Sequence, residues 1–278
     1  MREKMKKLLI FLLICISLLY VFPIFYTFTN SFMDSKQINS YGIETIPNQF
    51  NLQQYYSLAL EKGEYFKYFL NSIRLTALII GGQIVVGIFA AFALAKLKLP
   101  GGNVIFGIYV LAVLLPFQVT LVPNYLVFDK LERLLDVQLL DTHWAIILPG
   151  IFSSFGVFLM RQFIRGIPNE IIEAARADGA GYLTILFRII LPVIKPAIYS
   201  LVILTFIDNW NLIEQAIIFL DTAKKLPLSV FLENIYYEDY RVFFAGAVLY
   251  IIPALLILAK GEKYLKEGLI MGGLGHDK

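Results

Sequence analysis

The sequence predicts an all-α, polytopic membrane protein with six transmembrane helices. Of its 278 residues, 58% are hydrophobic and only 16% are charged, and the mean hydropathy is +0.71. A soluble domain carries about a quarter charged residues. The apolar residues are also gathered into long runs, whereas a single soluble core would draw on apolar positions spread along the chain. Both observations favour membrane spans.

Six stretches come close to the length of a membrane-spanning helix, which is about 20 apolar residues for about 30 Å of hydrocarbon. The third contains Pro116 and Pro123, so we expect its helix to kink or end near them. The first follows four basic residues, but it is too long for the apolar part of a secretory signal, so we interpret it as a retained anchor. The helices are expected over about residues 8–30, 72–95, 104–126, 143–163, 196–220 and 242–260.

The distribution of Lys and Arg predicts the orientation in the membrane. With the N-terminus inside, the inner segments hold 15 of the 24 basic residues and the outer segments hold the other nine. Both termini are therefore predicted to be cytoplasmic. The outer loops would then be residues 34–71, 129–142 and 221–241.

The composition argues against several classes of site. The net charge of +3 implies no nucleic-acid partner, and Cys15, the single cysteine, gives no disulfide framework. His143 and His276 lie far apart without clustered carboxylates or thiols, so we expect no metal site. No P-loop sequence occurs, and the chain is not expected to bind or hydrolyse ATP through one.

A charged, small-residue segment lies in the predicted cytoplasmic loop 164–195, between two apolar stretches. We expect a short helix there, with Asn169 as its cap, and with Glu170 and Glu173 in its first turn, where the helix dipole favours acids. Small alanines leave a smooth surface, and Gly179 stands where a left-handed C-terminal residue belongs. Residues 182–191 predict a second short helix, ended by Pro192 and Pro196.

The spacing in this loop narrows its function. Glu173-Ala174-Ala175 is followed after three residues by Gly179, and then after nine more by Ile189 and Leu191-Pro192. Taken without that spacing, the segment would be an ordinary amphipathic interfacial helix. With it, the loop resembles the cytoplasmic signature loop of ABC-importer permeases, a family of binding-protein-dependent transport system inner membrane components. The family's ATPase-docking positions correspond to Glu173, Ala174, Ala175, Asp178 and Gly179.

The resemblance extends over nearly the whole chain and is greatest to the smaller permease of maltose and multiple-sugar transporters. Two features depart from that pattern, namely Glu214-Gln215-Ala216, where the family often has a proline, and the ending after Gly275. The division that it implies is an anchor helix and external loop at 1–66, a type-I transmembrane core at 67–260 and a cytoplasmic tail at 261–278. Matching motifs include Asn71-Ser72, Pro116-Phe-Gln118, Val122-Pro123, Arg161-Gln-Phe163, Trp210-Asn211, Ala245-Gly246, Glu262-Lys-Tyr264, Lys266-Glu-Gly268 and Gly272-Gly273.

A polar stripe is expected on the fifth span. Asp208, Asn211 and Gln215 lie at i, i+3 and i+7, so they share one face of a helix, with Glu214 at its border and Trp210 on roughly the opposite side. Ionisable groups at membrane depth usually face a bundle interior or water. Two alternatives remain open, which are an interfacial position near the outer end and a role in helix packing. Our candidates for residues that line or border a translocation path are Asn209, Asn211, Glu214 and Gln215.

The glycines of the second and fourth spans have a different interpretation. We expect Gly81, Gly82 and Gly87, together with Gly150 and Gly156, to permit close helix packing instead of contacting a solute.

The resemblance implies a permease subunit and not an enzyme. Its partners would be a second, homologous permease, two copies of a cytoplasmic ATPase and an extracytoplasmic solute-binding protein, in a bacterial cytoplasmic membrane. The chain would bind no cofactor, with ATP and Mg²⁺ on the ATPase. The solute would be a sugar or oligosaccharide, with another polar solute such as glycerol phosphate or a polyamine as the alternative. An ATP-independent carrier would predict inverted repeats, which we do not find. A non-transporting scaffold is a further rival.

Overall fold

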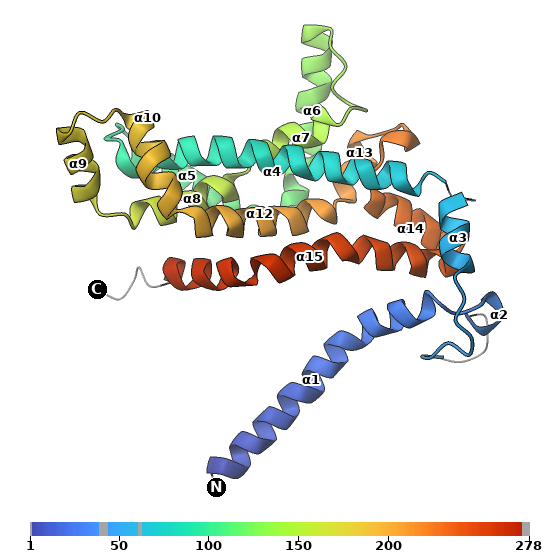
Figure 1. The fold of residues 1–278 in the computed structure, drawn as a ribbon. Helices are drawn as coiled ribbons and strands as arrows, with labels where there is room; N and C mark the ends of the chain where they lie inside the picture. The colour runs from blue at the N-terminus through green and yellow to red at the C-terminus, as the bar shows by residue number, and fades with distance from the viewer. Residues whose placement is uncertain (1, 39–43, 61–62, 274–278) are drawn as a thin grey trace. The chain divides into compact units, whose positions relative to one another are not determined.

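The computed structural model describes residues 2–38, 44–60 and 63–273, and these form helices without strands (Figure 1). The all-α prediction is confirmed. A π-helical turn occupies Leu186–Ile190 and a 3₁₀ turn Ala223–Lys225. The α-helices are α1 Arg2–Asn30, α2 Ser35–Ile38, α3 Gln53–Leu60, α4 Tyr65–Lys96, α5 Gly102–Leu114, α6 Phe117–Leu135, α7 Trp144–Ile151, α8 Ser154–Arg165, α9 Asn169–Ala177, α10 Tyr182–Ile185, α11 Leu191–Val193, α12 Lys195–Trp210, α13 Glu214–Phe219, α14 Leu228–Glu238 and α15 Tyr240–Gly273.

The chain forms two compact units, and α4, α14 and α15 contribute to both. The first unit comprises residues 1–67 and 231–253. In it, Gln54 on α3 holds the end of α1, because its Nε2 donates to the carbonyl oxygens of Asn30 (3.1 Å) and Met33 (2.5 Å). The hydroxyl of Tyr65 donates to the carbonyl oxygen of Gly246 on α15 (3.1 Å). The rest of α1 exposes apolar side chains along its length.

The second unit comprises residues 68–230 and 254–278 and holds two hydrophobic clusters. One cluster joins α4 to α8, α9, the π turn and α12, with Phe92, Ile164 and Leu186 among its buried members. The other joins α4 and α6 to α7, α13 and α14, through Ile79 and Phe219 among others. Both clusters therefore use α4, which runs alongside α12 in Figure 1.

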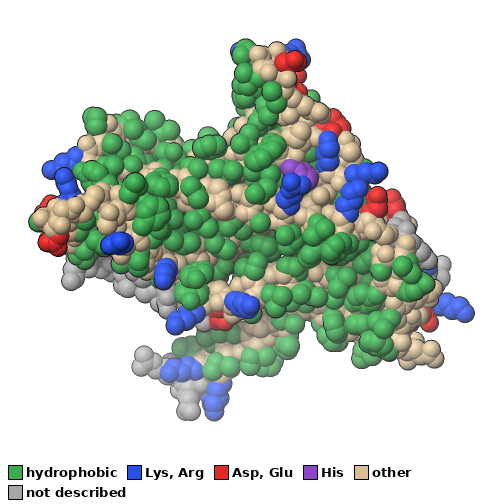
Figure 2. All heavy atoms as spheres, turned by 45° about the horizontal axis from the view of Figure 1, so that its top comes forward, with side chains coloured by type: hydrophobic (Ala, Val, Ile, Leu, Met, Phe, Trp, Pro, Cys, Tyr) green, Lys and Arg blue, Asp and Glu red, His purple; other side chains and the backbone are tan. Residues whose placement is uncertain are grey.

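Four described helices are long and apolar enough to cross a membrane, and the number rises to six if each of two bent pairs is one span. The four are Lys4–Asn30, Tyr65–Lys96, Trp144–Arg165 and Arg241–Tyr264. Hydrophobic side chains cover most of the face shown in Figure 2, as expected for a surface that contacts lipid. The predicted helix 143–163 consists of α7 and α8, which part at Phe152 and Ser153.

The third predicted helix, 104–126, is interrupted at Pro116, one of the two prolines near which a kink or an end was expected. It is replaced by α5 and α6, which meet at an angle of 107°, and α6 extends away from α4 and α5 (Figure 1). Pro116 stands at the break, as its sequence predicted, because proline disfavours helical geometry in the residue before it and has no N–H to donate. Pro123, the other expected kink, lies inside α6 without ending it.

The fifth predicted helix, 196–220, is wrong in its C-terminal part. The helix α12 ends at Trp210, and Asn211 to Ile213 separate it from the six-residue α13. The carbonyl oxygen of Leu212 accepts a hydrogen bond from the hydroxyl of Ser229. That bond, to a residue 17 positions later, satisfies a backbone group that the helix would otherwise have used.

Glycines let α4 approach α7 and α8, as the sequence predicted for Gly82, Gly150 and Gly156, whereas the prediction was wrong for Gly81, where a Cβ would meet nothing within 4 Å. A Cβ at Gly82 would collide with the side chain of Ile151, and one at Gly150 would lie 2.9 Å from Ile79. A Cβ at Gly87 would lie 3.5 Å from the backbone of Gly156. Small residues are the usual means by which membrane helices come into close contact.

Replacing Gly82 with alanine should therefore destabilise the protein by about 1–3 kcal/mol, the usual cost of overpacking. The adjacent Gly81 is a matched control, because a Cβ there would meet nothing within 4 Å. The measurement is the melting temperature of each variant in the same mild detergent. Equal melting temperatures for G82A and G81A would contradict the packing role.

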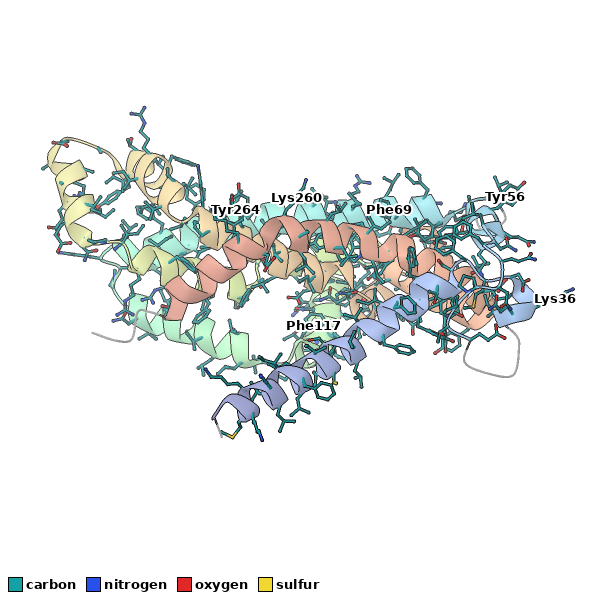
Figure 3. The ribbon with its side chains drawn as sticks, turned by 60° about the horizontal axis from the view of Figure 1, so that its bottom comes forward. Lys36, Tyr56, Phe69, Phe117, Lys260 and Tyr264 are labelled. Atoms are coloured by element: carbon teal, nitrogen blue, oxygen red, sulfur yellow. The ribbon has the colours of Figure 1, made fainter. Side chains whose placement is uncertain are left out.

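The N-terminal part of α12 packs against α15 within the second unit. A Cβ at Gly261 would collide with Ile203, and the rings of Tyr199 and Tyr264 stack with centroids 4.2 Å apart. Figure 3 marks this part of α15 by Lys260 and Tyr264. The end of the tail, residues 274–278, which includes His276, lies outside the described residues.

Hydrogen bonds fasten the loop between α13 and α14. The Asp141 carboxylate accepts from the backbone N–H groups of Asp221 (3.0 Å) and Thr222 (2.8 Å), and pairs with Lys225 (2.7 Å). Burial raises the pKa of Asp141, but these bonds outweigh it and hold the pKa well below its usual range. Asn71 and Ser72 hold the same loop. Nδ2 of Asn71 donates to the carbonyl oxygens of Lys224 and Leu226, and Oγ of Ser72 accepts from the backbone N–H of Leu228.

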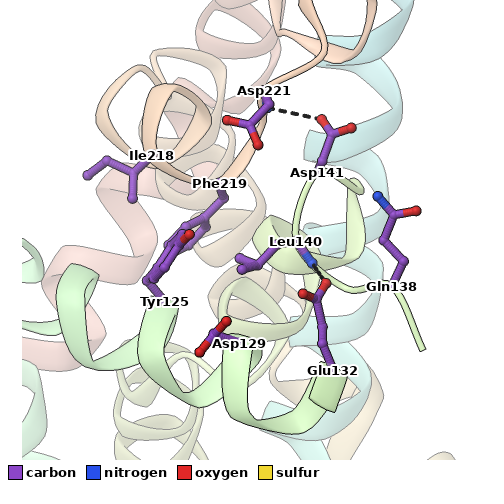
Figure 4. Close-up of a pocket in the computed structure, with 9 residues that line it drawn as sticks. All are labelled: Tyr125, Asp129, Glu132, Gln138, Leu140, Asp141, Ile218, Phe219 and Asp221. Carbon is purple, nitrogen blue, oxygen red and sulfur yellow. Dashed lines mark hydrogen bonds between the residues drawn. The ribbon is translucent and has the colours of Figure 1, made fainter. Parts of the chain in front are cut away.

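A small open pocket of about 270 Å³ lies beside this loop (Figure 4). Three of its four acidic residues have partners. Asp141 is paired as described above, Glu132 accepts from the backbone N–H groups of Leu139 and Leu140, and Asp129 pairs with Arg133 (2.9 Å). In the part of the chain that the structure describes, no group of three His, Cys, Asp or Glu is placed to hold a metal ion. We therefore regard the pocket as part of the loop's support.

Candidate functional site

The loop 164–195 places the short helix α9 at one end of the second unit (Figure 1). Its two sides differ in chemistry. Ile172 is buried against the cluster that contains Phe92 and Ile164, and Ala175 packs on the same cluster. Glu173 and Ala174 are exposed. The helix is thus fastened by one side and presents a surface of small and acidic residues on the other.

The start of α9 differs from its prediction. Asn169 is the first helical residue and not the cap, because Pro168 occupies the cap position with extended geometry. The Asn169 side chain instead accepts a hydrogen bond from Nζ of Lys96 (2.9 Å), which also donates to the carbonyl oxygen of Ile167. Glu170 lies in the first turn, whereas Glu173 comes after it. Lys96, at the end of α4, therefore fixes where α9 begins.

The end of α9 is as predicted. Gly179 has a φ of +85°, in the left-handed region that favours glycine. Its N–H donates to the carbonyl oxygen of Arg176 (3.0 Å), and the N–H of Ala180 donates to that of Ala175 (2.9 Å). These two bonds form a Schellman motif. A Cβ at Gly179 would meet nothing within 4 Å of its own chain, so the backbone conformation, and not internal packing, calls for glycine.

Aromatic contacts hold α9 to the next helix, α10. The guanidinium of Arg176 lies 5.1 Å from the ring centroid of Tyr182 on α10, and that ring meets Phe92 of α4 edge to face. Cation–π contacts at exposed sites are worth about 0.5–1 kcal/mol. Together with the buried Ile172, they seat α9 firmly on the unit.

The predicted helix 182–191 extends further than expected. Helical structure runs through α10, the π turn and α11 to Val193, and then bends by 73° into α12. Pro192 does not end it and lies within α11, directly after the π turn Leu186–Ile190. Ile185, Leu186 and Ile190 are fully buried here. This segment is therefore a packed link between α9 and α12.

The structure does not place the predicted path residues in one helical stripe. Asp208, Asn209 and Asn211 lie at the end of α12, whereas Glu214 and Gln215 lie on α13 beyond the break. The side-chain amides of Asn209 and Asn211 each donate to a carbonyl four residues earlier (2.8 Å).

Exposure separates the polar residues from Trp210. Asp208, Asn211 and Glu214 are exposed, and Asn209 and Gln215 are half-buried. Trp210 is buried, and its ring stacks on Phe206 and meets Phe69 edge to face. Trp210 is therefore buried, whereas its neighbours Asp208 and Asn211 are exposed.

Sequence reasoning missed Lys96 and Tyr182, which position α9. Both act through tertiary contacts, with Lys96 reaching residues more than 70 positions away. A cation at the end of a span is the only local signal for Lys96, and many such cations merely reach the interface.

Comparisons with known proteins agree with the geometry. Residues 83–260 match the family described as binding-protein-dependent transport system inner membrane component. The chain is 29% identical over 264 residues to the arabinooligosaccharides transport system permease protein AraQ of Bacillus subtilis (strain 168), a match that covers 93% of this chain and 92% of AraQ. It is 28% identical over 264 residues to the sn-glycerol-3-phosphate transport system permease protein UgpE of Brucella abortus (strain 2308), covering 91% and 92%.

A solved structure shares the fold. It is a chain of a bacterial ABC transporter involved in the import of the acidic polysaccharide alginate, with a TM-score of 0.85 and 24% sequence identity. The match covers 94% of this chain and 96% of that one. The architecture of the two chains is therefore the same over nearly their whole length.

Proposed function

We propose that this chain couples a separate ATPase to the uptake of sugars or oligosaccharides. The premise is that it belongs to the family of binding-protein-dependent transport system inner membrane components and is thus a permease subunit of an ABC importer. The observation that carries the coupling role is α9, a helix fastened by its buried side that presents Glu173 and Ala174 to an incoming partner. A helix that is packed on its neighbours passes a displacement by the ATPase on to them, whereas a loosely held helix would move by itself.

Five residues of the loop would contact the ATPase. Glu173 would make a charged contact, Ala174 and Ala175 would allow close approach, and Asp178 with Gly179 would form the turn beside them. Four of these five residues are exposed, namely Glu173, Ala174, Asp178 and Gly179. A partner can therefore reach them without unfolding the loop. ATP and Mg²⁺ would lie on the ATPase.

The full assembly that we propose has a second, homologous permease, two ATPase copies and an extracytoplasmic solute-binding protein. Both termini of this chain would be cytoplasmic, as the distribution of Lys and Arg favours. Movement of the ATPases would switch the bundle between inward and outward openings, with a different affinity for the solute in each state.

The charges near the end of α12 favour an uncharged solute. Asp208 and Glu214 are exposed carboxylates close in sequence to the amides of Asn209 and Asn211. Amides and carboxylates suit the many hydroxyl groups of a sugar. A phosphate group would meet like charge there, which costs affinity. Glycerol phosphate, the solute named for UgpE, is therefore the weaker candidate.

Replacing Asn211 and Glu214 with alanine tests the path. Loss of each hydrogen bond to the solute should lower uptake about fivefold, the equivalent of about 1 kcal/mol. The control is Gln138→Ala. Gln138 is a polar residue that lines the pocket beside the loop between α13 and α14, and it is not among the proposed path residues. Initial uptake rates are measured for a panel of oligosaccharides and for glycerol 3-phosphate. Unchanged rates and preference in N211A and E214A would rule these residues out of the path.

Purification from the native membrane tests the assembly. The tagged chain is solubilised in mild detergent, and the proteins that accompany it are quantified by mass spectrometry. We expect one homologous permease and two ATPase copies for each tagged chain. Recovery as a lone chain or homo-oligomer, under conditions that keep a known ABC importer intact, would overturn the proposal.

A further inference from the structure

Gln83 is a buried polar side chain in an apolar part of α4, with an exposed fraction of 4%. Both ends of its amide have partners on other helices. Its Oε1 accepts from the hydroxyl of Thr205 on α12 (2.5 Å), and its Nε2 donates to the carbonyl oxygen of Gly150 on α7 (3.2 Å). Within a bilayer a polar group must be satisfied by the protein, so these bonds are not readily exchanged for water.

The two bonds reach the helices on either side of the loop that carries α9. Thr205 lies on α12, which leaves that loop, and Gly150 lies in the last turn of α7, which continues into α8 and enters it. The last carbonyls of a helix have no partners within it. Gln83 therefore supplies a donor at the break between α7 and α8.

Packing brings α8 to the same point. A Cβ at Gly156 would lie only 2.9 Å from Cγ of Gln83, so α8 approaches this closely because residue 156 is glycine. A second set of contacts lies nearer α9, where Phe92 of α4 belongs to one cluster with Ile164 of α8 and Leu201 of α12. The same helices are thus joined at two levels along their length.

We propose that Gln83 is a positioning residue that locks α4, α7–α8 and α12 into one block. The proposal rests on the proposed function, because it concerns how displacement of α9 reaches the middle of the bundle. Without the lock, the break at Phe152 and Ser153 would bend and absorb part of that displacement. With it, α9 and the middle of α4 move together.

Distances between two spin labels test the block directly. Labels are placed at Ala177→Cys on α9 and Leu78→Cys on α4, two exposed positions on either side of Gln83, with Cys15→Ser as background. The full assembly is measured without nucleotide and after trapping with ATP and vanadate. We expect one narrow distance distribution that is the same in both states. In Gln83→Met, which keeps the volume but removes both hydrogen bonds, the distribution should broaden.

Thr205 gives a matched pair of variants, in case Gln83→Met assembles poorly. Thr205→Val keeps the shape of the side chain but loses the hydroxyl, and it should broaden the distance distribution. Thr205→Ser keeps the hydroxyl, and its distance distribution should be as narrow as that of the wild type. Uptake per ATP hydrolysed should fall roughly threefold to tenfold with Thr205→Val, as for loss of one strong interhelical bond.

Two results would overturn the lock. One is a wild-type distance that changes between the two states, and the other is variants with wild-type distributions that merely melt earlier. Because broadening without nucleotide needs no ATP hydrolysis, it is judged separately from the proposed function. Absence of an ATPase from the purified assembly would contradict the proposed function. The distance distributions measured without nucleotide would still test the role of Gln83.

Discussion

Replacing Gly179 with aspartate is expected to abolish ATP-driven uptake while the chain remains in the membrane. The residue is exposed, and nothing in its own chain lies within 4 Å of the Cβ position, so the new side chain would point into space that the proposed ATPase occupies. Aspartate tolerates left-handed backbone better than most residues, so the fold should survive. A carboxylate buried without a partner at an interface costs about 2–5 kcal/mol, enough to weaken docking about 30-fold or more.

Gly101 offers a closely matched control. It also has a left-handed backbone (φ +73°), and it also has no atom within 4 Å of its Cβ position, but it lies in the turn before α5. Gly101→Asp should therefore retain uptake. Membrane content is measured by quantitative blotting, ATPase retention by co-purification, and uptake with the preferred oligosaccharide. If Gly179→Asp kept its ATPase and transported normally, the docking role of this turn would be refuted.

The end of α9 was predictable because its signals are local. A run of alanines followed by Gly179 is sufficient, since a Schellman motif involves residues only a few positions apart. The break at Pro116 was predictable for the same reason, because proline acts on its own neighbours. Pro123 shows the limit of that argument, as α6 continues through it without a break. A proline signals a possible break, and the surrounding packing decides whether one occurs.

The break after Trp210 had no such local signal. Residues 211–213 are Asn-Leu-Ile, with neither glycine nor proline, and an apolar stretch resumes after Gln215. The features that fix the break are remote in sequence, namely the hydrogen bond from Ser229 to Leu212 and the burial of Trp210 against Phe69. The predicted polar stripe of Asp208, Asn211 and Gln215 is wrong because it assumed one continuous helix over 196–220, and α12 ends at Trp210. Lys96 could not be assigned to α9 from the sequence either, because its partners lie more than 70 residues away.

Reversing the charge of Glu173 is the second change expected to abolish uptake. Glu173 is exposed on the free side of α9, beyond the first turn, so its charge serves a partner more than the helix dipole. Lysine is a good helix former, and Glu173→Lys should leave α9 intact. If the ATPase presents a basic group here, the reversal turns an attraction into a repulsion. Truncating one member of a buried charge pair already costs about 2–5 kcal/mol.

Two further variants separate charge from location. Glu173→Gln removes the charge but keeps the shape, and it should fall between wild type and Glu173→Lys. Glu170→Lys makes the same reversal on the same helix, one turn earlier, at a residue outside the proposed docking set, and it should lose much less activity. ATPase retention and uptake are measured for all three at equal membrane content. Equal losses for Glu170→Lys and Glu173→Lys would mean that α9 needs only a general negative charge. Normal uptake with Glu173→Lys would show that Glu173 is not part of the docking surface. Glu173 lies on the helix α9 and Gly179 in the turn after it, on opposite sides of Ala175 in the sequence. The results for Glu173→Lys and Gly179→Asp together would therefore decide whether the partner contacts the helix, the turn or both.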